Sequence, residues 1–91
     1  MRYKFQPSFD RLFKKMVPYK QELIREAIEK LKSFHETNQL PQGLGLKSLR
    51  KQYWEIRATL HDRLLFSIDN DTICFILVGN HDDVRKFLKN Q

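Results

Sequence analysis

Five ionisable side chains stand where the sequence pattern predicts strands to end: Arg57, His61, Asp62, Arg63 and His81. Cleavage of RNA by attack of a ribose 2′-hydroxyl needs a base for that hydroxyl, an acid for the leaving 5′-oxygen, and positive charge on the phosphorane-like transition state. Histidine and arginine supply all three without a metal ion. The set is therefore a candidate catalytic site for RNA cleavage. The alternative, that these residues only decorate a solvent-facing sheet edge, stays open.

A three-stranded meander predicted over residues 53–81 must position these side chains. Trp54–Thr59 and Arg63–Asp69 alternate apolar and polar residues, which is the period of a half-buried strand. Thr72–Val78 is apolar on both faces, as in a central strand that is covered on both sides. The run Asp69-Asn70-Asp71 between the last two strands supplies turn chemistry.

The register of the meander decides what its arginines face. If Ile56 and Phe66 share the core face, then Arg57 and Arg63 share the opposite face, because a slip of one residue would bury the charges. Glu55 would lie on that same side, as would His61 and Asp62 in the connecting turn. Two guanidinium groups in one place indicate that an anion is expected there.

The flanking elements complete an α+β fold. Arg2–Gln6 alternates and predicts a short first strand; Ser8 suits the N-cap of a helix, and Pro18 opens a second helix that runs to about residue 37. Asn38–Gly45 reads as a loop, and Asp82–Asn90 predicts a short C-terminal helix. We expect a small twisted antiparallel sheet, formed by the N-terminal strand and the meander, packed on the helical hairpin.

Length and composition limit the function classes. The chain has 91 residues, which predicts a single domain over residues 1–91, and one cysteine, which excludes an internal disulfide. It contains no signal-peptide pattern and no apolar run near the ~18 residues that a membrane span requires. We therefore expect a cytoplasmic protein without a membrane partner. The net charge of +6 is compatible with nucleic acid or with an acidic protein partner.

The sequence predicts neither a metal nor a cofactor. The three histidines, His35, His61 and His81, lack the i, i+4 spacing of zinc ligands, and no CxxC motif is present. No P-loop, GxGxxG or nucleophile-elbow pattern occurs, so nucleotide hydrolysis and serine chemistry have no support.

The motifs of the second half resemble a known family. The run "YWEIR…DRLLFSID…ICFILVGNHDDVRKFLK", its basic lead-in LKSLRK and the order of elements look like the RelE/ParE superfamily of bacterial toxin–antitoxin toxins. The resemblance covers nearly the whole chain. Its most specific parts are the Trp-Glu-Ile-Arg strand, the Arg-Leu-Leu-Phe strand and the Val-Gly-Asn-His-Asp-Asp segment.

The resemblance implies roles for the candidate residues. In that family an arginine that matches Arg63 contacts the scissile phosphate, and Arg57 would help to neutralise it. The Gly-x-His after the last strand resembles the YafQ-like branch, in which the histidine matching His81 is catalytic. An aspartate of that branch falls on Asp62, and a nearby histidine corresponds approximately to His61.

The implied protein is the toxin of a type II toxin–antitoxin system, a ribosome-dependent mRNA endoribonuclease that inhibits translation. Its implied partners are a cognate antitoxin, which would form a toxin–antitoxin hetero-oligomer with it, and mRNA on the ribosome. The residues expected to contact the RNA backbone are Lys47, Arg50, Lys51 and Arg85.

Two departures from the family pattern keep other functions open. RelE has a Lys-x-Lys pair where this chain has Glu55 and Arg57, and a terminal-helix tyrosine that falls close to Phe87, which has no hydroxyl. Acid–base work would then pass to His81, with help from His61 or Asp62. The alternatives are a ParE-like inhibitor of DNA gyrase, or a catalytically inactive relic of the same fold that binds antitoxin or nucleic acid.

Overall fold

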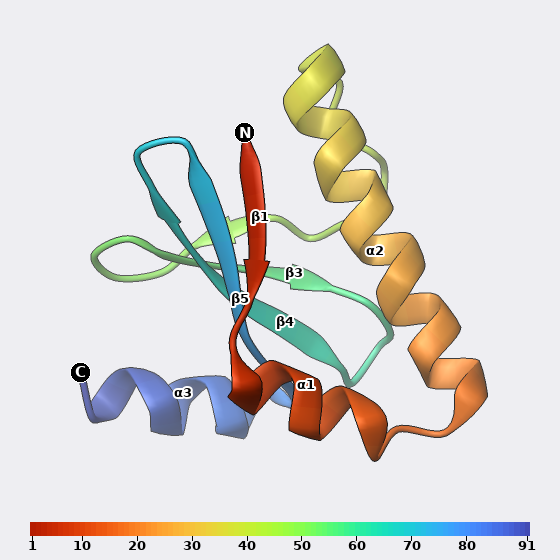
Figure 1. Cartoon of the computed structure of the whole chain (residues 1–91), viewed down its shortest axis with the longest axis vertical. Coiled ribbons are helices and arrows are strands. Elements are labelled where there is room, and N and C mark those ends of the chain that lie inside the picture. Colours follow the sequence, from red (N-terminus) through yellow and green to blue (C-terminus); the bar gives the residue numbers. More distant parts are fainter.

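The sheet is built from strands at both ends of the chain. A computed structural model describes residues 1–91. Its elements, in chain order, are β1 (Arg2–Phe5), α1 (Pro7–Lys14), α2 (Pro18–Thr37), β2 (Lys47–Ser48), β3 (Tyr53–Arg57), β4 (Arg63–Asp69), β5 (Thr72–Gly79) and α3 (His81–Lys89). The strands form one sheet in the order β1-β5-β4-β3-β2 (Figure 1). None of the helices combines the length and the apolar character that a membrane span requires.

The predicted α+β class is confirmed, but the sheet is mixed and not wholly antiparallel. β3, β4 and β5 form the expected antiparallel meander, whereas β1 pairs with β5 in parallel. The alternation in a strand reports which faces are buried and carries no information on strand direction, so the sequence could not reveal this. A fifth strand, β2, was not predicted, because two residues show no period; it pairs antiparallel with β3.

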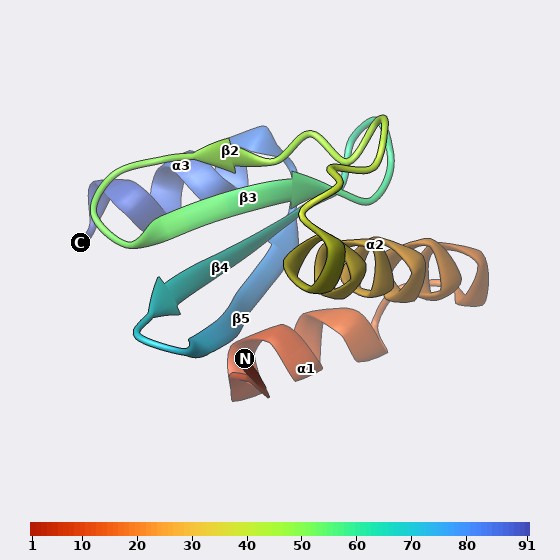
Figure 2. The same cartoon turned by 90° about the horizontal axis from the view of Figure 1, so that it is seen from above.

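The helices cover the two faces of the sheet unequally. α1 and α2 lie on one face and α3 on the other, as the view from above shows (Figure 2). The larger core lies under α1 and α2, where α2 buries its apolar positions at i, i+3 and i+4: Ile24, Ala27, Ile28 and Leu31. The smaller core lies under α3, where Val84 packs on Leu65 and Ile76.

A β-bulge fits the central strand to both helical layers. Leu65 pairs with Leu77 and Phe66 with Phe75, so Ile76 is the extra residue on β5. Consequently Ile76 and Leu77 both pack toward α3, although a regular strand would turn them to opposite faces. The strand is apolar on both faces because both cores contact it, and the bulge turns one additional apolar residue toward α3.

Phe75 lies at the centre of the larger core. It has no exposed surface, and its ring centroid is 5.1 Å from that of Phe5, 5.8 Å from Phe9 and 5.7 Å from Phe66. Phe75→Ala should lower the free energy of unfolding by about 3–5 kcal/mol, because it leaves a cavity among these rings. Urea unfolding measures the change. The control Leu40→Ala, at a side chain that is 56% exposed, should unfold like the wild type.

Candidate functional site

The pairing of β3 with β4 sets the two arginines side by side. Arg57 is the direct cross-strand partner of Arg63, and Ile56 is that of Leu64. Ile56 and Phe66 are buried in the core beneath α1 and α2. The predicted arrangement of both arginines on the opposite face is therefore confirmed. This is the face that α3 covers in part.

Glu55 lies on the same face and binds one of the arginines. Its Oε2 is 3.3 Å from Nη1 of Arg63, and the side chains are 6% and 16% exposed. That distance is longer than the roughly 2.7–2.9 Å of a strong charge-assisted hydrogen bond. Nε of Arg63 is buried and has no hydrogen-bond partner. Glu55 therefore holds the guanidinium of Arg63 through one long contact and leaves the Nε–H of Arg63 without an acceptor.

Arg57 and Lys47 extend the positive charge on this face. Arg57 is exposed, and its aliphatic stem passes over Gly45, where an added Cβ would lie 3.0 Å from Cγ of Arg57. Lys47 of β2 is the cross-strand partner of Glu55, so it shares the face. Two arginines and one lysine thus surround a single carboxylate.

Asp62 closes the turn between β3 and β4. The prediction that it shares the side of the arginines is wrong, because its carboxylate pairs with Lys20 on the side of α2. It is only 7% exposed, and its Oδ2 accepts a hydrogen bond from Oγ1 of Thr59 at 2.7 Å and pairs with Nζ of Lys20 at 3.3 Å. Oγ1 of Thr59 in turn accepts from the backbone N–H of His61 and of Asp62, at 3.2 and 2.9 Å. These contacts hold in place the backbone that carries the His61 side chain.

His81 is the first residue of α3, one position earlier than the helix predicted from Asp82. Asn80 is the N-cap: its side chain accepts from the N–H of Asp83, and Oδ2 of Asp83 accepts from the N–H of Asn80. Gly79 makes room for this capping box, because a Cβ there would lie 2.6 Å from Oδ2 of Asp83. The Gly-Asn-His-Asp-Asp segment is therefore a strand end, a cap and a helix start that hold His81 in place.

A small cavity joins the turn to the start of α3. It has a volume of about 190 Å³, and the residues that line it are Leu60, His61, Arg63, Asn80, His81 and Asp82. The structure thus brings His61, Arg63 and His81 together from three separate segments. Arg57 and Asp62 do not line this cavity.

A second, strongly basic cavity continues along α3. Its volume is about 600 Å³, and it is lined by Arg50, Asp82, Arg85, Lys86, Leu88 and Lys89. Asp82 lines both cavities, so the two adjoin. Of the residues predicted to contact RNA, Arg50 and Arg85 line this cavity, and Nη1 of Arg50 donates to the carbonyl of Leu88 at 3.5 Å. Lys47 and Lys51 do not.

Several lining residues were missed by the sequence analysis. Four of the lining residues are spaced at i, i+3, i+4 and i+7, as on one helix face: Asp82, Arg85, Lys86 and Lys89. This spacing could have identified Lys86 and Lys89 from the sequence. Asn80 entered the sequence analysis only as part of the Val-Gly-Asn-His-Asp-Asp segment, with no role of its own. Leu60 gave no signal at all, because one apolar residue in a turn has no period.

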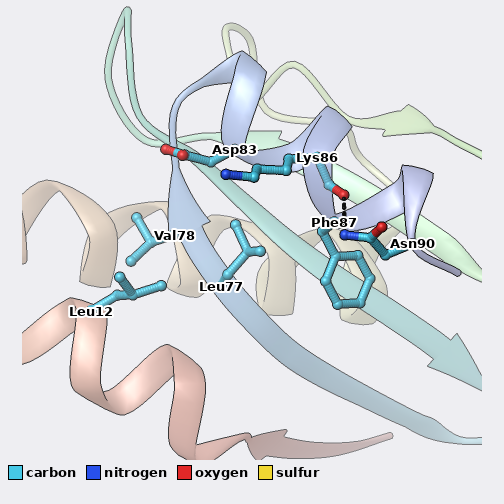
Figure 3. A pocket seen from close by; sticks show the side chains of 7 residues that line it. All are labelled: Leu12, Leu77, Val78, Asp83, Lys86, Phe87 and Asn90. Carbon is cyan, nitrogen blue, oxygen red and sulfur yellow. Dashed lines mark hydrogen bonds between the residues drawn. The ribbon is translucent and has the colours of Figure 1, made fainter.

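A third cavity lies on the other flank of α3 and contains no histidine. Leu12 of α1, Leu77 and Val78 of β5, and Phe87 of α3 enclose about 350 Å³, with Asp83, Lys86 and Asn90 at its rim (Figure 3). Phe87 also packs edge-on against Tyr53, with 5.4 Å between ring centroids. Phe87 is therefore a packing residue and does not line the cavity of His81.

Solved structures show which fold this is. The chain superposes on the toxin fold of the RelB–RelE antitoxin–toxin complex from Methanococcus jannaschii with a TM-score of 0.69 and 21% identity, covering 92% of this chain and 96% of that one. A copper-bound mutant toxin from Helicobacter pylori gives 0.73 and 16%, covering 92% and 98%. The E. coli DinJ–YafQ complex gives 0.66 and 17%, with the same coverage. No family model and no curated protein matches the sequence.

The chain has the RelE/ParE toxin fold. The resemblance noted in the sequence is thereby confirmed for the fold, over 92% of the residues. Metal ligation has no candidate, because no three histidine, cysteine or carboxylate side chains gather closely enough to hold an ion.

The hydrogen bonds of Thr59 allow a test of the turn. Thr59→Val should lower the free energy of unfolding by about 1–3 kcal/mol, because two backbone N–H groups lose their acceptor and the buried Asp62 carboxylate keeps only Lys20 as a partner. Amide hydrogen exchange at His61 and Asp62 should become faster. Thr37→Val, at an exposed hydroxyl on the end of α2, is the matched control and should change neither quantity. Unaltered exchange in Thr59→Val would contradict the role of this turn.

Proposed function

We propose that this protein is the toxin of a type II toxin–antitoxin system and acts as a ribosome-dependent mRNA endoribonuclease in the cytoplasm. The observation that carries the proposal is the small cavity in which His61, Arg63 and His81 meet. The fold it shares with antitoxin-bound RelE and with YafQ supports the same assignment.

The residues of the cavity match the demands of 2′-hydroxyl attack. One histidine takes the proton of the 2′-hydroxyl as its oxygen bonds to phosphorus, and the other gives a proton to the 5′-oxygen as the P–O5′ bond breaks. The products are a cyclic phosphate and a free 5′-hydroxyl. Arg63, with Arg57 beside it, stabilises the charge that develops on the phosphorane oxygens. His81 and His61 are the acid–base pair, one acting as the base and the other as the acid.

Asp62 takes a positioning role in this scheme. Its carboxylate is directed to Thr59 and Lys20, so it orients His61 through the turn and exchanges no proton with RNA. In this turn, His61 therefore faces the substrate and Asp62 holds the backbone.

The basic cavity along α3 provides a path for the RNA backbone. Arg50, Arg85, Lys86 and Lys89 line it, and it adjoins the cavity of His81 through Asp82. Phosphates bound there would be consecutive with the one that is cut. Lys47 lies on the arginine-bearing face of the sheet and Lys51 in the turn before β3, and both add to the positive field at the margin of this path.

A cognate antitoxin is the partner that accompanies this function. RelE of Methanococcus jannaschii and YafQ of E. coli were each solved in a complex with such a protein. An acidic or amphipathic segment that covers the basic surface would form a toxin–antitoxin hetero-oligomer by coupled folding and binding.

His81 gives the most direct test of the chemistry. Its side chain is exposed and makes no hydrogen bond within the protein, so His81→Ala should leave stability unchanged. Primer extension on a reporter mRNA after induction should show cuts within translated codons for the wild type and none for His81→Ala. The decrease in cleavage should be about 10²–10⁴-fold, as expected for removal of a general acid or base.

The control for this experiment is His35→Ala, which removes a histidine at the far end of α2, where its Nδ1 lies 3.1 Å from the carbonyl oxygen of Leu31. It should cut like the wild type. A gyrase supercoiling assay run in parallel addresses the alternative. Intact mRNA with blocked supercoiling would assign a ParE-like inhibitor, and neither effect would assign a binding relic. Arg63 is a poorer probe, because its removal leaves Glu55 buried without its partner.

The basic cavity can be tested by salt dependence. Replacing Arg85 and Lys89 with glutamine should weaken binding to single-stranded RNA and reduce the slope of log K against log[salt] by about 0.7 for each phosphate that the variant no longer binds. Lys14 and Lys15, exposed at the end of α1, provide the control pair with the same change of charge. Equal slopes for the two double variants would contradict an RNA path along α3.

A further inference from the structure

Leu60 is an exposed leucine at the mouth of a polar cavity. Its side chain is 77% exposed, the most of any large apolar residue in the chain. It is also the one hydrophobic residue that lines the cavity of His61, Arg63 and His81. It therefore contributes nothing to either core, and it is placed beside the groups that would act on RNA.

The turn that carries Leu60 is held from both sides. The backbone N–H groups of Ala58 and Thr59 donate to the carbonyl of Asp62 at 2.9 and 3.3 Å. The hydroxyl of Thr59 and the ion pair of Asp62 with Lys20 add the side-chain contacts described above. The apolar side chain is therefore presented to solvent by an ordered turn.

The size of the cavity indicates what Leu60 would meet. At about 190 Å³ it is smaller than the roughly 300–1,000 Å³ of sites that enclose whole small molecules. A phosphate group can enter beside Arg63, whereas the attached bases must remain at the rim. The face of a base is an apolar surface, and proteins cover such faces with aromatic rings, guanidinium planes or, around a base removed from its stack, apolar side chains.

We propose that Leu60 packs against the face of the nucleobase next to the scissile phosphate and so positions the RNA strand in the cavity. This inference rests on the proposed function, because it takes RNA as the substrate. Leu60 would contribute to binding and orientation and would take no part in proton transfer. Because every base has such a face, the contact would favour RNA whose bases are unstacked and would not discriminate between sequences.

The test is a cycle of protein and substrate variants. Single-turnover cleavage is measured on bacterial ribosomes programmed with an mRNA, using wild-type protein and Leu60→Ala, on the intact message and on messages with an abasic nucleotide on either side of the cut. Leu60→Ala should raise the half-saturating protein concentration about 5-fold or more on intact mRNA. On the message lacking the contacted base, the two proteins should cut alike, because the contact is already absent.

Two further variants make the outcome specific. Leu60→Phe, which keeps an apolar surface, should restore or tighten the half-saturating concentration. Leu40→Ala removes another exposed leucine, in the loop before β2, and should behave as the wild type. Thermal unfolding of Leu60→Ala should also match the wild type, because so exposed a side chain packs on little.

The outcomes separate this inference from the proposed function. Equal cleavage by wild type and Leu60→Ala on intact mRNA would overturn the role of Leu60 and leave the nuclease assignment standing. A defect of equal size on intact and abasic messages would also overturn it, since Leu60 would then act on something other than a base. A wild-type protein that cuts no mRNA would contradict the proposed function itself, and this inference with it.

Discussion

The register between β3 and β4 is the constraint on which both the core and the site depend. Pairing Ile56 with Leu64 places apolar side chains under α1 and α2, and the same register pairs Arg57 with Arg63 on the other face. A slip of one residue would bury two guanidinium groups and expose the core, so the hydrophobic effect fixes the position of the charges. The alignment of the arginines is thus a consequence of burial, and no contact between them is needed to hold it.

The start of α3 is the second point at which folding and site geometry coincide. Gly79 ends β5 and leaves space for Asp83, whose carboxylate caps the backbone at Asn80. This capping box fixes the direction of α3, and with it the direction of His81 and of the basic face that follows. Because Val84 anchors the same helix on the smaller core, a disturbance of that core would move His81 and the basic cavity together.

Local periodicity decides which parts of the molecule could be predicted from the sequence. The meander, α2 and the facing of the arginines follow from alternation and helical spacing, and they are found as expected. The parallel direction of β1, the two-residue β2 and the bulge in β5 depend on long-range pairing, which leaves no local pattern. In the site, the sequence could predict that His61, Arg63 and His81 lie together, because strands that pair bring their ends together. The orientation of the Asp62 side chain could not be predicted, because it depends on an ion pair with Lys20, which lies far earlier in the chain.

The balance of charge around Glu55 is the feature of this face that bears on anion binding. Arg57 and Arg63 face one another directly across the sheet, an arrangement that is unfavourable for like charges. Glu55, on the same face and opposite Lys47, offsets part of that repulsion and forms an ion pair with Arg63. One carboxylate against three cations leaves an excess of positive charge, and a phosphate is the anion that would restore the balance. The departure from a lysine pair at this strand is therefore compatible with phosphate binding, because Glu55 preorganises Arg63 without neutralising its neighbours.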